Sequence, residues 1–187
     1  MAKSSGGVRI VGTYTNTEAG NRAEFYARLN TKMYEEGYSS ISEKTGAYVL
    51  YMKGHNYHRD EVEAAKALAD DGINVILTPE GAEYNVYATT YRKNQPKFSE
   101  GYVNFYSYEQ RTPTSDSTIS SIKKALRHTN DKHADVCVIY DKYGSFKRED
   151  IEYGMKSYQQ HSSQWKHIKA VLVINSKRKV YEHYFDK

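Results

Sequence analysis

The feature that most constrains the fold is a helical pattern that leads straight into an apolar strand. Residues 59–69 are rich in alanine and charged residues, the pattern stops at Gly72, and the strand-like run 73–77 follows at once. Residues 136–140 and 168–174 are further apolar runs, of the kind buried on both faces of a sheet. We therefore predict an α/β fold with a central mixed β-sheet flanked by helices.

The chain divides into two parts in this interpretation, with a boundary near Gly54. Residues 1–54 form a predicted N-terminal extension with a small β-α-β addition, and residues 55–187 form the α/β core. The extension has predicted strands at 8–14 and 47–52 and a helix at 18–35. The core has predicted helices at 59–71, 148–158 and from Thr114 or Ser115 onwards, and strands at 73–78, 84–91, 102–109, 136–140, 168–174 and 180–185.

The composition limits the partners of the chain. The formal net charge is +4 over 187 residues, which permits nucleic-acid binding without requiring it. No apolar run approaches the roughly 18 residues that a membrane helix needs, and the N-terminal residues lack the apolar segment of a signal peptide. The single cysteine, Cys137, rules out an internal disulfide and is expected in the core. We expect no membrane association and a cytoplasmic site of action.

Glu61 is the first candidate for a charged site. It lies at helical spacing from Ala65 and Leu68 within the 59–71 helix, so we expect it at the rim of the buried stripe. A carboxylate in that position needs a partner or a metal ion. The alternative is an ordinary acidic residue in the first helical turn, where the helix dipole favours negative charge.

A second charged group lies in and before the strand predicted at 102–109. Alternation places Glu109 and Arg111 on one face of that strand together with Val103, and Glu100 precedes the strand. A metal-dependent nuclease needs two or three carboxylates around Mg²⁺ and a cation near the phosphate. A solvated Glu–Arg pair at a strand end would explain the same residues without a function.

These segments together resemble the PD-(D/E)xK nuclease superfamily, and most closely the tRNA-nuclease toxin domains at the C-termini of contact-dependent growth inhibition proteins. The order and the spacing of the segments are more specific than any one of them, and the resemblance covers about residues 55–175. The segments that carry it are the helix and strand at 61–77, Glu100-Gly101-Tyr102-Val103, Tyr108-Glu109-Gln110-Arg111-Thr112-Pro113 and the strand at 135–140.

The resemblance implies the fold of a restriction-endonuclease-like sandwich. It also implies a metal-dependent endonuclease that acts on nucleic acid, with RNA favoured over DNA and tRNA as the favoured RNA. Glu61, Glu100 and Glu109 would hold Mg²⁺ or Mn²⁺, while Arg111 and Lys132 would stabilise charge on the phosphate. It also implies a toxin of a bacterium or its mobile elements, delivered from another cell, with a cognate immunity protein as partner.

The chain departs from the family motif in two ways. Glu100 stands where the motif has aspartate, and Arg111 stands where it has lysine, although arginine cannot exchange a proton at neutral pH. A lysine of the following helix, Lys123 or Lys132, is the candidate to take the place of the motif lysine. The alternative function is a non-catalytic binding or structural protein of a phage or mobile element that keeps a degenerate nuclease scaffold.

Histidines and basic residues give two weaker hypotheses. A metal-independent ribonuclease with a histidine as general base remains open, and His55 is its first candidate because it lies in a polar turn. Several basic residues form a predicted phosphate-binding surface, although charged runs are usually solvated. They are Arg59, Lys66, Arg92, Lys93, Lys97, Lys123, Lys124 and Arg127.

Overall fold

The strands follow one another across a single sheet in the order in which they occur in the chain. The computed structural model describes residues 38–52, 54–78, 99–104, 106–114, 118–161 and 163–185, and within them the sheet has eight strands in the order β1 to β8. The strands are β1 (Tyr38–Ile41), β2 (Tyr48–Tyr51), β3 (Val75–Leu77), β4 (Gly101–Val103), β5 (Tyr106–Arg111), β6 (Val136–Tyr140), β7 (Ala170–Ile174) and β8 (Val180–His183).

Helices provide the crossovers that parallel strands require. The pairs β2–β3, β5–β6 and β6–β7 are parallel, and the other four are antiparallel. The connecting helices are α2 (Arg59–Asp70), α4 (Thr118–Asp131) and α5 (Arg148–His161), the last followed by the 3-10 helix η2 (Ser163–His167). The predicted α/β fold with a central mixed sheet is therefore confirmed.

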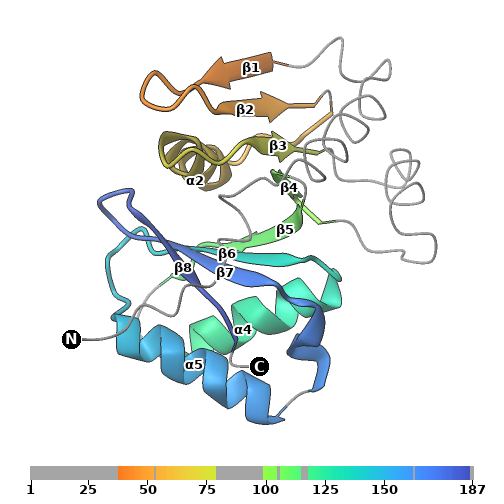
Figure 1. The fold of residues 1–187 in the computed structure, drawn as a ribbon, viewed down its shortest axis with the longest axis vertical. Helices are drawn as coiled ribbons and strands as arrows, with labels where there is room; N and C mark the ends of the chain where they lie inside the picture. Colours follow the sequence, from red (N-terminus) through yellow and green to blue (C-terminus); the bar gives the residue numbers. More distant parts are fainter. Residues whose placement is uncertain are drawn as a thin grey trace, which may run out of the picture.

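The helices cover opposite faces of the sheet. In Figure 1, α4 and α5 lie side by side below β6 and β7, while α2 lies beside the strands at the other end of the sheet. The core on the α2 face includes Val136 and Val138, and the core on the α4–α5 face includes Cys137 and Ile139. Successive residues of β6 thus serve different cores, which is why this strand is apolar without interruption.

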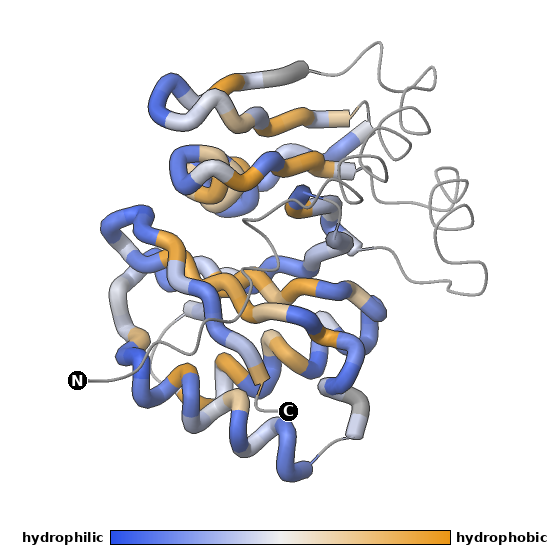
Figure 2. The backbone as a smooth tube through the Cα atoms, in the orientation of Figure 1, coloured by the Kyte–Doolittle hydropathy of each residue, from blue (hydrophilic) through white to orange (hydrophobic). Residues whose placement is uncertain are grey.

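The neighbouring strands β6 and β7 are the most apolar part of the sheet. Every residue of β6 and β7 is buried, and Figure 2 shows these strands as largely hydrophobic segments inside a hydrophilic periphery. Cys137 is fully buried there as predicted, and burial raises the pKa of its thiol to about 12. A thiol in this state is an inert core group.

The prediction of one strand at 102–109 is wrong, because the structure has two antiparallel strands there, β4 and β5. Asn104 adopts a left-handed backbone conformation, with φ of 53°, and reverses the chain between β4 and β5. Asparagine tolerates this conformation better than most residues. The reversal puts Val103 in the α2-face core beside Tyr108, so Val103 does not share a face with Glu109 as predicted.

The remaining boundaries differ by a few residues at the ends of elements. α5 extends to His161, three residues beyond the prediction, and β7 begins at Ala170 rather than at residue 168. β1 was not predicted at all. The strand predicted at 8–14, the helix at 18–35 and the strand at 84–91 lie outside the described residues, and the boundary near Gly54 stays a prediction. In the described part of the chain, no helix is long and apolar enough to cross a membrane.

Candidate active site

The candidate site lies where α2 begins and β5 ends. Glu61 is in the first turn of α2, and its side chain is 14% exposed. It faces His55, whose Nε2 lies 3.4 Å from Oε2 of Glu61 and whose Nδ1 lies 2.9 Å from the carbonyl oxygen of Thr78. Glu61 is therefore an enclosed carboxylate at the rim of the buried stripe, as the helical spacing predicted.

The register of β5 against β6 distributes its polar residues between the two faces. Glu109 pairs with Cys137 and so points towards α4, whereas Gln110 pairs with Val138 and points towards α2. Both side chains are buried. Gln110 Nε2 donates a hydrogen bond of 3.3 Å to the carbonyl oxygen of Asp60, which ties the end of β5 to the first turn of α2.

Glu100 lies at the edge of β5, where it meets groups from both faces. Its main-chain N–H donates to the carbonyl oxygen of Tyr108, and its Oε2 accepts a 2.7 Å hydrogen bond from the N–H of Gln110. Burial, followed by the negative charges of Glu109 and Glu61, raises the pKa of the Glu100 carboxyl to about 9. The negative charges of Glu61 in α2 and Glu109 in β5 therefore both act on the carboxyl of Glu100, which precedes β4.

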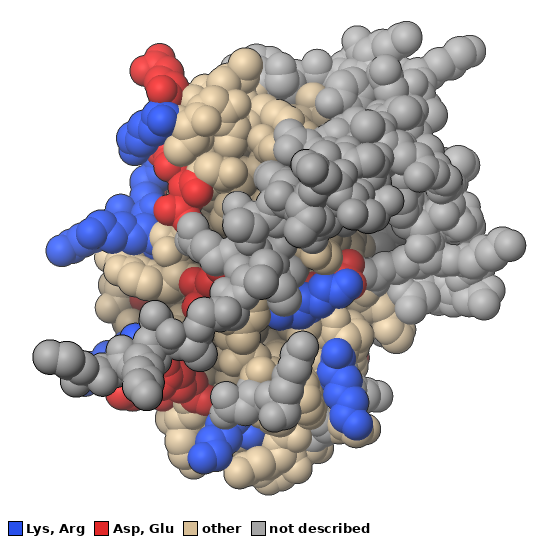
Figure 3. All heavy atoms as spheres, in the orientation of Figure 1, with Lys and Arg blue, Asp and Glu red and all other residues tan. Residues whose placement is uncertain are grey.

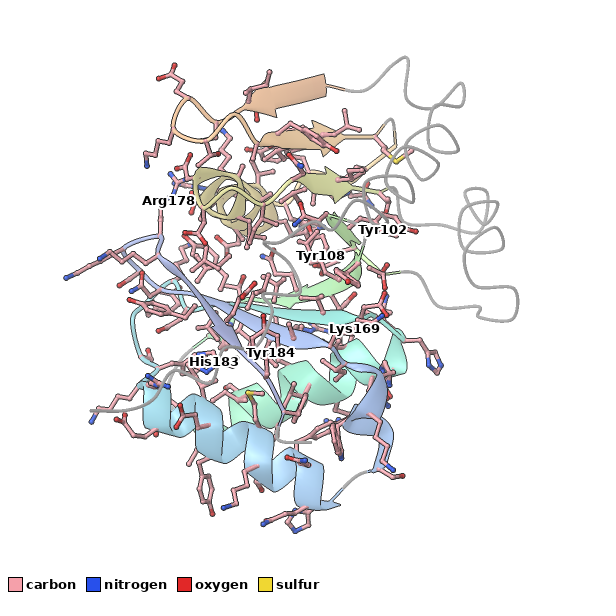
Figure 4. The ribbon with its side chains drawn as sticks, in the orientation of Figure 1. Tyr102, Tyr108, Lys169, Arg178, His183 and Tyr184 are labelled. Carbon is pink, nitrogen blue, oxygen red and sulfur yellow. The ribbon has the colours of Figure 1, made fainter. Side chains whose placement is uncertain are left out.

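Polar atoms without hydrogen-bond partners surround Glu100. Oε2 of Glu61, Oη of Tyr108 and Oε1 of Gln110 are all buried and receive no hydrogen bond from the described residues. Figure 4 shows Tyr108 between α2 and β5, and burial together with the charge of Glu100 raises the pKa of its phenol. Buried polar atoms of this kind call for a partner, which is a cation, a water or a ligand group.

This donor set fits a divalent metal ion in its chemistry. Carboxylate and amide oxygens are the ligands that Mg²⁺ and Mn²⁺ prefer, and a cation would offset the charge that Glu61, Glu100 and Glu109 share. Among the described residues, no group of three or more His, Cys, Asp or Glu side chains already has the arrangement of a metal site.

Glu109 makes a close contact that the sequence analysis did not anticipate. Its Oε1 lies 2.7 Å from Nε2 of His128 on α4, and Nε2 of His128 also contacts the guanidinium of Arg111. Because Arg111 is exposed whereas Glu109 is only 2% exposed, the imidazole connects the buried carboxylate with the surface cation. The sequence showed His128 only as a residue near a helix end, four residues before Lys132, so no local pattern marked it.

A cavity of about 370 Å³ opens onto this group, and we call it the acidic cavity. Glu61 and Glu100 line it together with Arg111, so carboxylates and a cation face the same space. Its lining residues are His58, Arg59, Asp60, Glu61, Glu100, Gln110, Arg111 and Thr112. The predicted candidates Glu61, Glu100 and Arg111 thus come together, with Glu109 adjoining them from the α4 face.

Of the other predicted candidates, Arg59 also lines the acidic cavity, whereas Lys132 and Lys66 do not. Lys132 is in the turn after α4, where its main-chain N–H donates to the carbonyl oxygen of His128. Arg59 pairs with Glu63 on the same helix, and Lys66 is an exposed residue of α2. The predicted basic residues at positions 92, 93 and 97 lie outside the described residues.

Comparison with known proteins supports the fold. No protein-family model matches the chain, and no curated protein has a significantly similar sequence. A chain of the solved CdiA-CT/CdiI toxin and immunity complex from Burkholderia pseudomallei is similar in structure, with a TM-score of 0.50 and 18% sequence identity. The match covers 67% of this chain and 82% of that chain. At this identity the likeness shows the fold alone, which this chain shares with a chain of that toxin and immunity complex.

Proposed function

We propose that this chain is a metal-dependent nuclease of PD-(D/E)xK type that acts on RNA, with tRNA as the favoured substrate. The observation that carries the proposal is the acidic cavity, in which Glu61, Glu100 and Arg111 line one space. These residues come from a helix, from the residue before β4 and from the end of β5. Acidic residues that can hold a metal ion, beside a cation that can face phosphate, form one arrangement that supports phosphodiester hydrolysis.

The roles follow from the environment of each residue. Glu61, Glu100 and Glu109 would hold Mg²⁺ or Mn²⁺, and the ion would activate a water molecule and offset negative charge on the phosphate. Glu100 has a pKa of about 9 because of burial, Glu109 and Glu61, so its charge would respond most to a bound cation.

Arg111 is the cation of the site in this proposal. It lines the acidic cavity, and a guanidinium can bind phosphate oxygens through paired N–H donors. Because arginine keeps its proton, Arg111 acts as a charge stabiliser and not as an acid or a base. Lys132 does not line the acidic cavity, and the proposal therefore rests on Arg111.

The similar structure suggests a biological context. It is one chain of a toxin and immunity complex, so we extend the proposal to a toxin with a cognate immunity partner, delivered from another cell. Exposed large side chains, including Tyr57 and Tyr143, are available for such a contact in the described part of the chain.

The first test is a cleavage assay with purified protein on total tRNA, single-stranded DNA and duplex DNA, each with Mg²⁺, with Mn²⁺ and with EDTA. We expect metal-dependent cleavage of tRNA that Glu109→Ala abolishes. Glu149→Ala is the matched control, because Glu149 is an exposed glutamate on α5 and loses the same charge.

Two outcomes would overturn the proposal. Folded protein that cuts none of the three substrates would support the non-catalytic scaffold instead. Cleavage that persists in EDTA and is lost in His128→Ala would support a histidine-dependent ribonuclease, which the contact of His128 with Glu109 makes the specific alternative.

A further inference from the structure

A second cavity lies beside the acidic cavity, between α4 and the segment that follows β5. Its volume is about 390 Å³, and we call it the basic cavity. Arg111 and Thr112 line both cavities, so the two spaces adjoin. The lining residues of the basic cavity are Arg111, Thr112, Pro113, Thr114, Ser121, Lys124, Ala125, Arg127, His128 and Asp131.

The charge of the basic cavity is opposite to that of its neighbour. Arg111, Lys124 and Arg127 are its cations, and Asp131 is its one carboxylate among the described residues. The described residues form no ion pair with Lys124 or Arg127, in contrast with Arg148, which pairs with Glu152 on α5. These cations therefore have charge available for an external anion.

The spacing along α4 explains why these side chains converge. Ser121, Lys124 and His128 are three and four residues apart, so they occupy one stripe of the helix, directed at the end of β5. The neighbouring stripe, with Ile122 and Leu126, is buried in the core. The same amphipathic pattern that anchors α4 thus fixes a row of donors along the cavity.

We propose that the basic cavity binds the backbone phosphates of a nucleic-acid strand next to the phosphodiester that occupies the acidic cavity. The second half of this statement rests on the proposed function. Guanidinium and ammonium groups are the usual donors to phosphate oxygens, and the hydroxyl groups of the lining add neutral donors. Arg111 lies at the junction and contacts the strand between its two sites.

The size and placement of the charge favour a strand over an acidic protein. A volume of about 390 Å³ lies at the lower end of the range for small-molecule sites and suits a nucleotide unit. A protein partner needs a contact of about 800 Å² per side. Among the described residues on the face in Figure 3, Lys and Arg lie interspersed with Asp and Glu.

The test is a binding measurement that does not depend on cleavage. Fluorescence anisotropy in EDTA would compare labelled RNA and DNA 12-mers of the same sequence, so that the two sources of phosphodiester are distinguished. The test variant is Lys124→Ala/Arg127→Ala. The matched control is Lys147→Ala/Lys156→Ala, which removes two exposed lysines in and before α5.

We expect the test variant to bind at least about tenfold more weakly than wild type near 0.1 M salt. Its slope of log K against log salt should be smaller by about 1.4, because each lost phosphate contact on a single strand contributes about 0.7. The exchange variant Lys124→Arg/Arg127→Lys should bind like wild type, since it keeps both charges. Circular dichroism would check that every variant is folded.

Two outcomes would overturn the proposal. One is unchanged binding in the test variant, which would assign the cations to an acidic protein partner instead. The other is an equal loss in the control variant, which would show that only net charge matters. The proposed function can fail while this inference holds. If binding depends on the basic cavity but the protein cleaves no substrate, the nuclease proposal is refuted and the phosphate-binding proposal stands.

Discussion

The parallel neighbours β5 and β6 are both mostly buried and yet have opposite compositions. β6 reads Val-Cys-Val-Ile-Tyr, whereas β5 reads Tyr-Ser-Tyr-Glu-Gln-Arg. Glu109 lies beside Cys137 in the register, and each is at most 2% exposed. A buried carboxylate is costly unless it is paired, whereas a buried apolar side chain stabilises the fold. We infer that β6 was shaped for stability and the end of β5 for chemistry.

The difference separates two kinds of substitution. Changes in the charged group at the end of β5 should reduce activity and leave stability equal or higher, because its buried polar atoms are incompletely satisfied. Changes in β6 should reduce stability and leave the activity of the folded molecules intact. The following predictions test this separation, from the largest effect to the smallest.

The largest effect is expected for Glu100→Gln. Cleavage should fall by about 10³-fold, because an amide cannot supply the charge that a metal ion or a developing charge requires. In metal-free buffer the variant should be more stable than wild type near pH 8. The pKa of Glu100 is about 9 in the folded state against an ordinary value of 4.5, so stability falls by about 1.4 kcal/mol per pH unit between those values.

Thermal melts from pH 4 to pH 9 would measure the stability effect. The wild type and Glu100→Gln should coincide below about pH 4.5, where the carboxyl is protonated in both states, and diverge as the pH rises. Mg²⁺ should raise the melting temperature of wild type more than that of the variant. If stability changes equally with pH in the two proteins, the raised pKa assigned to Glu100 is refuted.

The converse case is Ile139→Ala in β6. Ile139 is fully buried on the α4–α5 face, so its truncation leaves a cavity and should cost about 2–5 kcal/mol. Urea unfolding would give the free energy, and active-site titration would give activity per folded molecule, which we expect to be unchanged. Tyr153→Ala is a suitable control because Tyr153 is 61% exposed. A fall in activity per folded molecule would mean that the two strands are not separable.

The smallest effect is expected for His128→Ala. His128 contacts Glu109 and Arg111 and so acts as a positioning residue, whose loss typically costs about 10–100-fold. The loss should appear mainly in kcat, since the imidazole contacts the carboxylate, with a smaller rise in KM because His128 also lines the basic cavity. Steady-state kinetics beside His161→Ala, an exposed histidine of α5, would test this. An increase in KM alone would place His128 in substrate binding.

Local patterns determined most of the fold, and their failures have clear causes. The helix at 59–71 and the strand at 136–140 were predicted almost to the residue, because periodicity and apolar runs record which face is buried. The break at Asn104 was missed because strand-favouring residues flank it on both sides, and a left-handed turn at asparagine leaves a weak sequence signal. One missed turn was enough to move Val103 to the opposite face.

The sequence by itself determined the α/β architecture and the candidate residues Glu61, Glu100, Glu109 and Arg111, since periodicity and motif order are local properties. Only the tertiary structure decided how these residues relate. The register of β5 on β6 directs Glu109 towards α4, and the packing of α4 brings His128 to it across nineteen positions of chain. The burial of Glu100 and its nearness to Glu109 and Glu61, which no local pattern showed, then raise the pKa of its carboxyl.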